Sequence, residues 1–130
     1  MTIDPFSFVG SPGMAMPFDI KQTKERLEAN GGGYEIVHLS PGFEVGVYVL
    51  VAPEPDRQQP HDDDELYIVL DGFGVLDVEG EPVPLEVGQA VFVPAGARHG
   101  FTAYVQLSVL VIFARRYSVA ARPRGVGVPA

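Results

Sequence analysis

The stretch Gln-Pro-His-Asp-Asp-Asp-Glu-Leu-Tyr-Ile-Val-Leu-Asp-Gly, residues 59–72, decides the fold of this 130-residue chain. In an extended strand, side chains alternate between two faces, so Gln59 and His61 are expected to point to the same side. Glu65 then opens an apolar run in which it shares a face with Tyr67. A carboxylate on the inward face of such a strand needs a metal, a cation or a hydrogen-bond network. This stretch therefore predicts a strand that carries a polar site.

A second group of residues supplies another potential ligand, His99, which follows the turn Pro94-Ala95-Gly96. The chain has no cysteine, so a metal would be held by imidazole, carboxylate and amide groups. The candidate ligands are Gln59, His61, Glu65 and His99. Two imidazoles and one carboxylate suit a divalent transition metal with open coordination positions. The alternatives are that His99 only ends a turn, that His61 is a loop residue, and that Gln59 hydrogen-bonds a neighbour or a metal-bound water.

From residue 34 onward the sequence alternates between short β-rich runs and turn residues. The expected strands are Tyr34–Leu39, Gly46–Val51, Glu65–Leu70, Val75–Glu79, Val83–Leu85, Ala90–Val93, Phe101–Tyr104 and Leu107–Phe113. Short strands at this spacing, without intervening helical patterns, predict an all-β sandwich or barrel of mostly antiparallel strands. Asp71-Gly72 and Glu79-Gly80 are expected to form tight hairpin turns, because glycine accepts the positive φ that such turns require.

The chain is predicted to have three parts. Residues 1–33 form an apolar, proline-broken arm followed by one short helix at about 20–29, with Asp19 as its N-cap and Gly31 as its stop. Residues 34–113 form the β domain. Residues 114–130 form a flexible tail that holds four of the nine basic residues, either solvated or in contact with an acidic surface.

Composition argues against several classes of function. The net charge of −8 disfavours binding to nucleic acid, which depends on clustered lysine and arginine. The sequence contains no apolar run long enough for a membrane span and no secretory pattern at its start, so a cytoplasmic location is expected. The run Asp62-Asp63-Asp64 predicts either a solvated loop or a negative field that attracts a divalent ion.

The two ligand-bearing stretches resemble the two motifs of the cupin family. The first motif is matched by Gln59, His61, Glu65 and Gly72, and the second by Gly88, Pro94, Gly96 and His99. The resemblance covers about residues 34–113 and implies a double-stranded β-helix, or jelly-roll barrel. It also implies a metal bound by His61, Glu65 and His99. Gln59 stands where the family has its first histidine, and Ala103 stands where the second motif often has asparagine.

The resemblance favours an enzyme that binds a small molecule, and most of all a dioxygenase that uses Fe, Mn or Ni, with Zn as a further possibility. The alternatives are a metal-dependent isomerase or lyase, a non-catalytic ligand-binding module, and a structural barrel that has lost its metal. Strand parity nominates Tyr67 and Phe101 as the substrate pocket, and Tyr48 on an adjacent strand is a third candidate whose face parity does not fix, because Gly46 can introduce a bulge. Core packing is the alternative for all three. His38 matches neither motif and is expected to be structural. The family also implies a homodimer.

Overall fold

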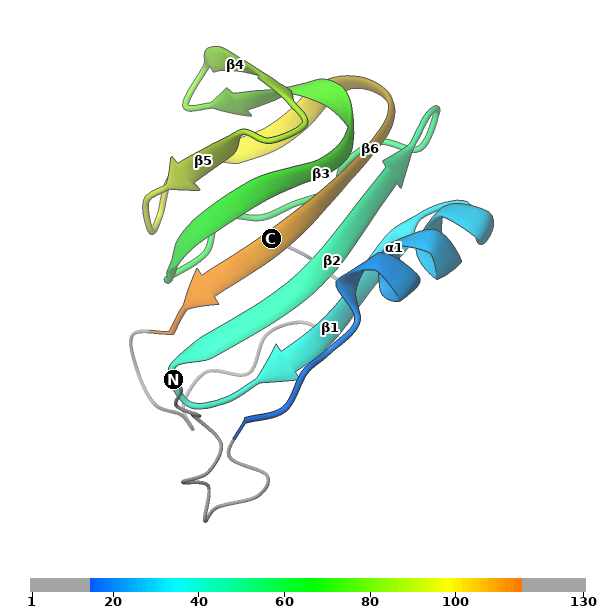
Figure 1. Cartoon of the computed structure of the whole chain (residues 1–130). Helices are drawn as coiled ribbons and strands as arrows, with labels where there is room; N and C mark the ends of the chain where they lie inside the picture. The colour runs from blue at the N-terminus through cyan, green and yellow to red at the C-terminus, as the bar shows by residue number, and fades with distance from the viewer. Residues whose placement is uncertain (1–14, 116–130) are drawn as a thin grey trace.

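The computed structural model of the protein describes residues 15–115 and contains one helix and one antiparallel sheet (Figure 1). The elements are α1 (Ile20–Ala29), β1 (Gly33–Leu39), β2 (Phe43–Val51), β3 (Asp64–Val78), β4 (Glu81–Glu86), β5 (Ala90–Val93) and β6 (His99–Ala114). The strand order is β1-β2-β6-β3-β4, and β5 also pairs with β3. This arrangement confirms the predicted antiparallel β fold with one short helix.

The ladder between β3 and β6 is the longest in the sheet. It runs from the pair Asp64 and Ala114 to the pair Val78 and His99, and its register shifts at three places. Register shifts of this kind bend a strand and increase its twist. In Figure 1, β4, β5 and the second half of β3 accordingly curl over the first part of the sheet. One continuous sheet therefore supplies both layers of the barrel.

The prediction of a hairpin turn at Asp71-Gly72 is wrong, because β3 continues through these residues to Val78. The structure instead bends the strand here, with register shifts on both sides of Gly72, which has φ +78°. A glycine signals positive φ but does not tell whether the chain reverses or only bends. The two strands predicted at 101–104 and 107–113 likewise form the single strand β6.

The hairpin predicted at Glu79-Gly80 is confirmed. Val78 of β3 pairs with Glu81 of β4, so these two residues form the whole connection. Both have positive φ, 52° for Glu79 and 86° for Gly80. Two successive positive φ values are the signature of the type I′ turn, whose twist matches that of the flanking strands.

Side chains that alternate along each strand build the core inside the barrel. Along the first half of β3, the buried residues are Glu65, Tyr67 and Val69, which share one face as their spacing predicts. The core also contains Leu76 from the second half of β3 and buried residues of other strands, which include Leu85, Val93, Phe101, Leu107, Val109, Val111 and Phe113. Because Glu65 lies among these side chains, the barrel interior contains a carboxylate.

Helix α1 spans the residues predicted for it and lies on the outer side of the sheet (Figure 1). Asp19 caps its start by accepting a hydrogen bond from the backbone N–H of Gln22 at 2.8 Å. Two polar contacts join it to the sheet: Lys24 pairs with Asp71, and Ser108 donates to Glu28. In the part of the chain that the structure describes, no helix is long and apolar enough to cross a membrane.

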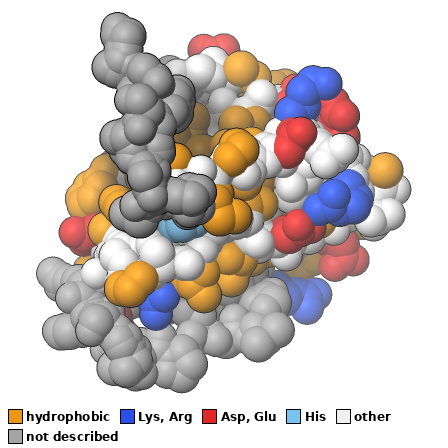
Figure 2. Space-filling view, turned by 60° about the horizontal axis from the view of Figure 1, so that its bottom comes forward, with side chains coloured by type: hydrophobic (Ala, Val, Ile, Leu, Met, Phe, Trp, Pro, Cys, Tyr) orange, Lys and Arg blue, Asp and Glu red, His pale blue; other side chains and the backbone are white. Residues whose placement is uncertain are grey.

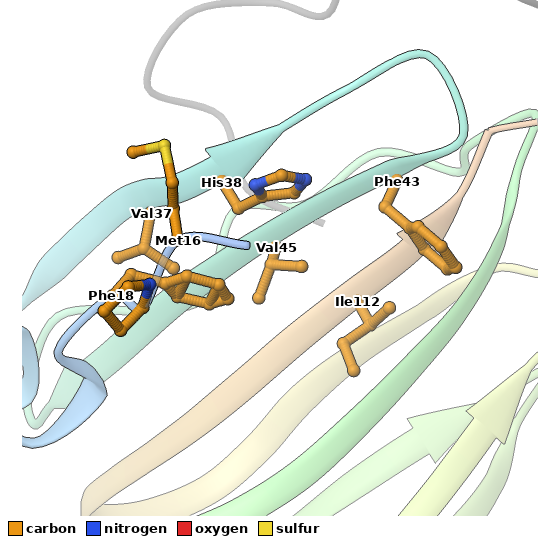
Figure 3. A pocket seen from close by; sticks show the side chains of 8 residues that line it. Met16, Phe18, Val37, His38, Phe43, Val45 and Ile112 are labelled. Atoms are coloured by element: carbon orange, nitrogen blue, oxygen red, sulfur yellow. The ribbon is translucent and has the colours of Figure 1, made fainter. Parts of the chain in front are cut away.

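The outer face of β1, β2 and β6 carries an apolar groove of about 480 Å³. It is lined by Met16, Pro17, Phe18, Val37, His38, Phe43, Val45 and Ile112 (Figure 3). In Figure 2, hydrophobic side chains gather on one part of the surface and charged side chains on another. The ring of His38 stacks on that of Phe18 with centroids 5.7 Å apart, which agrees with a structural role. An exposed apolar face is common at protein interfaces, and the homodimer stays a prediction.

Two predicted regions lie largely outside the described residues. Of the N-terminal arm, the structure describes the part from residue 15 onward, and of the tail it describes residues 114 and 115. Arg115 donates a hydrogen bond to the backbone carbonyl of Ser40 at 3.2 Å. The other three arginines of the tail, Arg116, Arg122 and Arg124, lie outside the described residues.

Replacing Gly72 with alanine should destabilise the fold because the added Cβ would lie 2.1 Å from the backbone carbonyl oxygen of Gln106. We expect the free energy of unfolding to fall by about 2–4 kcal/mol, from left-handed strain plus overpacking. Gly80→Ala is the matched control, because Gly80 also has positive φ but no atom near the added Cβ. It should lose only about 1 kcal/mol. Equal losses for the two variants, measured by chemical denaturation, would contradict the close approach at Gly72.

Candidate metal centre

Three of the four predicted ligands come together inside the barrel. His61, Glu65 and His99 each offer one donor atom, and these atoms all lie within 4.8 Å of one another. Oε1 of Glu65 and Nε2 of His99 are 3.0 Å apart, and the two side chains are only 1% and 2% exposed. Nε2 of His61 is buried as well. The group therefore offers two imidazole nitrogens and a carboxylate around one point.

Closure of the sheet brings Glu65 and His99 together. Along the β3–β6 ladder, Glu65 pairs with Phe113, whereas His99 pairs with Val78 at the opposite end. In a flat sheet, the distance between those ends would be about 40 Å, at a rise of about 3.3 Å per residue. Their side chains nevertheless touch, because the second half of the ladder curls back over the first. The candidate metal centre is thus a direct product of the bends in β3.

His61 comes from the connection between β2 and β3, residues 52–63, and two hydrogen bonds tie its neighbourhood to the turn before β6. The backbone N–H of Gly96 donates to the carbonyl of His61 at 2.6 Å. The backbone N–H of Ala95 donates to Oδ1 of Asp64 at 2.9 Å. One member of the predicted aspartate run therefore has a structural role. These bonds fix the backbone of His61 relative to the turn that leads to His99.

The hydrogen bonding of His99 leaves its Nε2 as the nitrogen for a metal. Its Nδ1 lies 2.9 Å from the carbonyl oxygen of Ala97, and a carbonyl only accepts, so Nδ1 carries the proton. Burial acts to lower the pKa of His99, but hydrogen bonding to the carboxylate of Glu65 and the carbonyl of Ala97 outweighs it and leaves the pKa raised. A carbonyl that orients the far nitrogen in this way is common behind metal-binding histidines.

Aromatic contacts hold the two imidazole rings in place. The ring of His61 lies against that of Phe113, with centroids 5.1 Å apart, and its centroid is 5.6 Å from that of His99. The ring of Tyr67 meets that of His99 edge-on at 6.1 Å. The donor set, its burial and its fixed rings fit a divalent transition metal.

The fourth predicted ligand, Gln59, is exposed. Residues 55–61 do not form a strand, so side chains there do not alternate strictly between two faces. The side chain of the preceding residue, Gln58, is half-buried and accepts a hydrogen bond from the hydroxyl of Tyr67 at 2.8 Å. Gln59 as a ligand stays a prediction, while Gln58 is a polar residue of the interior that the motif spacing did not indicate.

Of the three residues nominated for a substrate pocket, Tyr67 and Phe101 lie beside His99, and Tyr48 is linked to Phe101 through Asp56. The rings of Tyr67 and Phe101 meet edge-on, with centroids 5.0 Å apart. The hydroxyl of Tyr48 donates to Oδ1 of Asp56 at 2.5 Å, and the backbone N–H of Phe101 donates to Oδ2 of the same carboxylate at 2.8 Å. Asp56 therefore joins two of the nominated residues, although no sequence motif contained it.

Both tyrosines remain protonated at neutral pH. Burial raises the pKa of Tyr48, and the nearby carboxylate of Asp56 raises it further. Burial also raises the pKa of Tyr67 well above its ordinary value, with a smaller contribution from Glu65. These hydroxyls are consequently hydrogen-bond donors, Tyr48 to Asp56 and Tyr67 to Gln58.

A pocket of about 500 Å³ opens beside His99. Its walls are formed by the start of β6, the hairpin between β3 and β4, and Asp56, and the lining residues are Asp56, Asp77, Glu79, Gly80, Arg98, His99, Gly100, Phe101 and Thr102. Three carboxylates face one guanidinium in this set. Such a lining is better suited to a neutral or cationic molecule than to a strongly anionic one.

Comparisons with known proteins agree with this architecture. A family model described as the Cupin domain matches residues 47–113. A solved RmlC-like cupin family protein with a double-stranded β-helix fold, from Methanocaldococcus jannaschii, superposes with a TM-score of 0.65 at 18% identity. The match covers 78% of this chain and 92% of that one. At this level of identity, the similarity concerns the fold.

Two relatives extend the match at the level of sequence. An acireductone dioxygenase of Sulfurihydrogenibium sp. (strain YO3AOP1) is 43% identical over 49 residues, which are 35% of this chain and 27% of that enzyme. An uncharacterised protein of Streptomyces coelicolor is 35% identical over 97 residues, which are 74% of this chain and 92% of that protein. The Streptomyces match and the family model, together with the barrel itself, show that this chain belongs to the cupin superfamily.

Proposed function

We propose that this protein is a metal-dependent cupin that acts on a small oxygen-bearing molecule as a dioxygenase. The observation that carries the proposal is the convergence of His61, Glu65 and His99 within 4.8 Å of one another inside the barrel. Three protein ligands leave coordination positions open, which is typical of catalytic sites and not of closed structural ones. The partial match to an acireductone dioxygenase supports the dioxygenase assignment.

Some groups of the site would bind the metal, and others orient the side chains that bind it. His61, Glu65 and His99 would hold Fe, Mn or Ni, with Zn as a further possibility. When bound, such an ion polarises oxygen-bearing substrates and, if redox-active, supports chemistry with dioxygen. The carbonyl of Ala97 keeps the proton of His99 on Nδ1, away from the ligand nitrogen.

The walls of the site would orient the substrate and limit the access of water. Tyr67 and Phe101 are buried and form an apolar surface next to His99. The hydroxyls of Tyr48 and Tyr67 donate their protons to Asp56 and Gln58, so these two side chains would help to shape the wall of the site and would not donate to a substrate. A compact molecule with adjacent oxygens would thus meet an apolar wall next to the open coordination positions.

Removing His99 should abolish metal binding, whereas removing Gln59 should not. Elemental analysis of purified protein after metal reconstitution should give close to one equivalent for wild type and for Gln59→Ala. His99→Ala should contain almost none, because two ligands remain in a buried site. Similar metal content in wild type and His99→Ala would contradict the proposed centre, and loss of metal in Gln59→Ala would restore that residue as a ligand.

Metal affinity should fall as the pH decreases, because protons and metal compete for Nε2 of His99. The pKa of His99 is raised in the metal-free protein, so the fall should begin above pH 6.5, the usual value for histidine. Below that pKa, affinity should drop about tenfold per pH unit through the protonation of His99. Titrations of Mn²⁺ between pH 5.5 and 8 would measure this, and a constant affinity would contradict histidine ligation.

In the metal-free protein, the folding stability contributed by the pair of His99 and Glu65 should change with pH in the opposite direction to the metal affinity. A raised pKa means that the folded state binds the proton more tightly than the unfolded chain does. The stabilising contribution of protonated His99 next to Glu65 is therefore complete below the unfolded pKa, and it is lost as the pH rises through the folded pKa. Thermal unfolding of metal-free protein over the same pH range provides the comparison with the metal titrations.

The dioxygenase assignment has a direct test in oxygen uptake. Protein reconstituted anaerobically with Fe²⁺, Mn²⁺ or Ni²⁺ should consume oxygen when a small enediol substrate is added, and His99→Ala should not. If wild type binds metal but no metal supports oxygen uptake, the site would fit isomerase or lyase chemistry or a non-catalytic binding module. A small molecule that stays bound through purification would favour the binding module.

A further inference from the structure

The connection between β2 and β3 contributes His61, yet its own residues form no strand. It runs over residues 52–63, and stretches of this length without secondary structure are uncommon unless they serve a function or are held by side-chain contacts. Its end is fixed by the bonds of His61 and Asp64 to the turn before β6. The position of His61 also depends on how the earlier part of this connection is held.

Asp56 holds that earlier part. Its carboxylate accepts hydrogen bonds from the hydroxyl of Tyr48 on β2, from the backbone N–H of Phe101 on β6, and from the side-chain amide of Gln58. Oδ2 also lies 3.6 Å from where a side chain at Gly100 would begin, so the carboxylate packs closely against β6. One side chain therefore joins the connection to two neighbouring strands of the barrel.

The same network continues to the candidate ligands. Gln58 donates to Asp56 and accepts from the hydroxyl of Tyr67, which lies two residues after Glu65 on β3. Phe101, whose N–H donates to Asp56, lies two residues after His99 on β6. Asp56 is thus linked to the strands that carry Glu65 and His99, and it lies in the segment that carries His61.

We propose that Asp56 is a positioning residue of the metal centre: its hydrogen bonds from Tyr48 and Phe101 hold residues 52–63 against β2 and β6, and its bond from Gln58 orders the connection itself, so that His61 is directed toward Glu65 and His99. This inference rests on the proposed metal-binding function. Asp56 itself contacts no candidate donor atom in the hydrogen bonds described above. Its effect on metal is exerted through the backbone of the connection, as is usual for groups that orient metal ligands.

The test compares Mn²⁺ affinities by calorimetric titration of the full-length protein. Asp56→Ala removes all three hydrogen bonds and should weaken binding about 10-fold or more, a typical loss for a group that orients ligands. Asp56→Asn should retain affinity within about 3-fold, because its carbonyl can accept from Phe101 and Gln58 while its amide donates to the hydroxyl of Tyr48. Circular dichroism and thermal unfolding of the metal-free variants check that each is folded.

Asp62→Ala is the control for charge. It removes one negative charge next to His61, from an exposed side chain, and it should bind Mn²⁺ within about 3-fold of wild type. If Asp56→Ala binds as well as Asp62→Ala does, the positioning role is wrong. If Asp56→Asn loses as much affinity as Asp56→Ala, charge and not position is responsible, which also overturns the proposal.

A milder variant keeps the proposal testable if Asp56→Ala does not fold. Tyr48→Phe removes one of the three donors and should weaken Mn²⁺ binding about 2- to 5-fold, in the same direction. Tyr34→Phe is its control, because the hydroxyl of Tyr34 donates to Glu44, outside the connection. Equal affinities of these two variants would count against the proposal.

The failure of this inference can be told apart from failure of the metal site. If wild type binds neither Mn²⁺ nor Ni²⁺, the proposed function fails, and the role of Asp56 fails with it. If wild type binds metal, His99→Ala does not, and Asp56→Ala binds as wild type does, the metal centre stands and only the positioning role is overturned.

Discussion

Closure of one bent sheet is the constraint on which the rest of this structure depends. The ladder between β3 and β6 extends from Asp64 to Val78, and it must bend before Glu65 and His99 can meet. Gly72 permits this bend because its positive φ and its missing side chain allow the backbone to approach that of β6. The barrel interior, its buried carboxylate and the adjacent pocket all follow from this curvature.

Within the closed barrel, the candidate ligands are held in different ways. Glu65 and His99 belong to strands, and their positions are set by backbone pairing. His61 belongs to a connection and is placed by individual hydrogen bonds, among them the bond from Gly96 to its carbonyl. The centre therefore combines two ligands on a rigid frame with one whose position is more sensitive to side-chain substitutions.

Much of the fold and of the candidate metal centre could be predicted from the sequence, because the informative patterns were local or had fixed spacing. Strand alternation placed Glu65 and Tyr67 on one buried face, and capping signals gave both ends of α1. The spacing of the two motifs indicated that His99 would meet Glu65. These are properties of a strand, a helix end or a family pattern, and each can be recognised without knowing which strands pair.

The remaining features depend on pairing that no local pattern encodes. Whether Asp71-Gly72 reverses the chain or bends it is decided by β6, which continues alongside β3 through these residues. The strand geometry from which Gln59 and His61 were expected to share a side is absent, because residues 52–63 form no strand. No sequence pattern indicated a role for Asp56, because its partners on β2 and β6 are brought to it only by the closed barrel.

The contact between Glu65 and His99 has a further consequence for a chain that has no cysteine. An ion bound there would connect the beginning of β3 with the beginning of β6, two points far apart along the chain. Because the three ligands meet only in the folded barrel, the binding free energy of the ion would add to the stability of the fold, and a chelator would remove that contribution. The metal would then be a reversible crosslink of the barrel as well as its centre of chemistry.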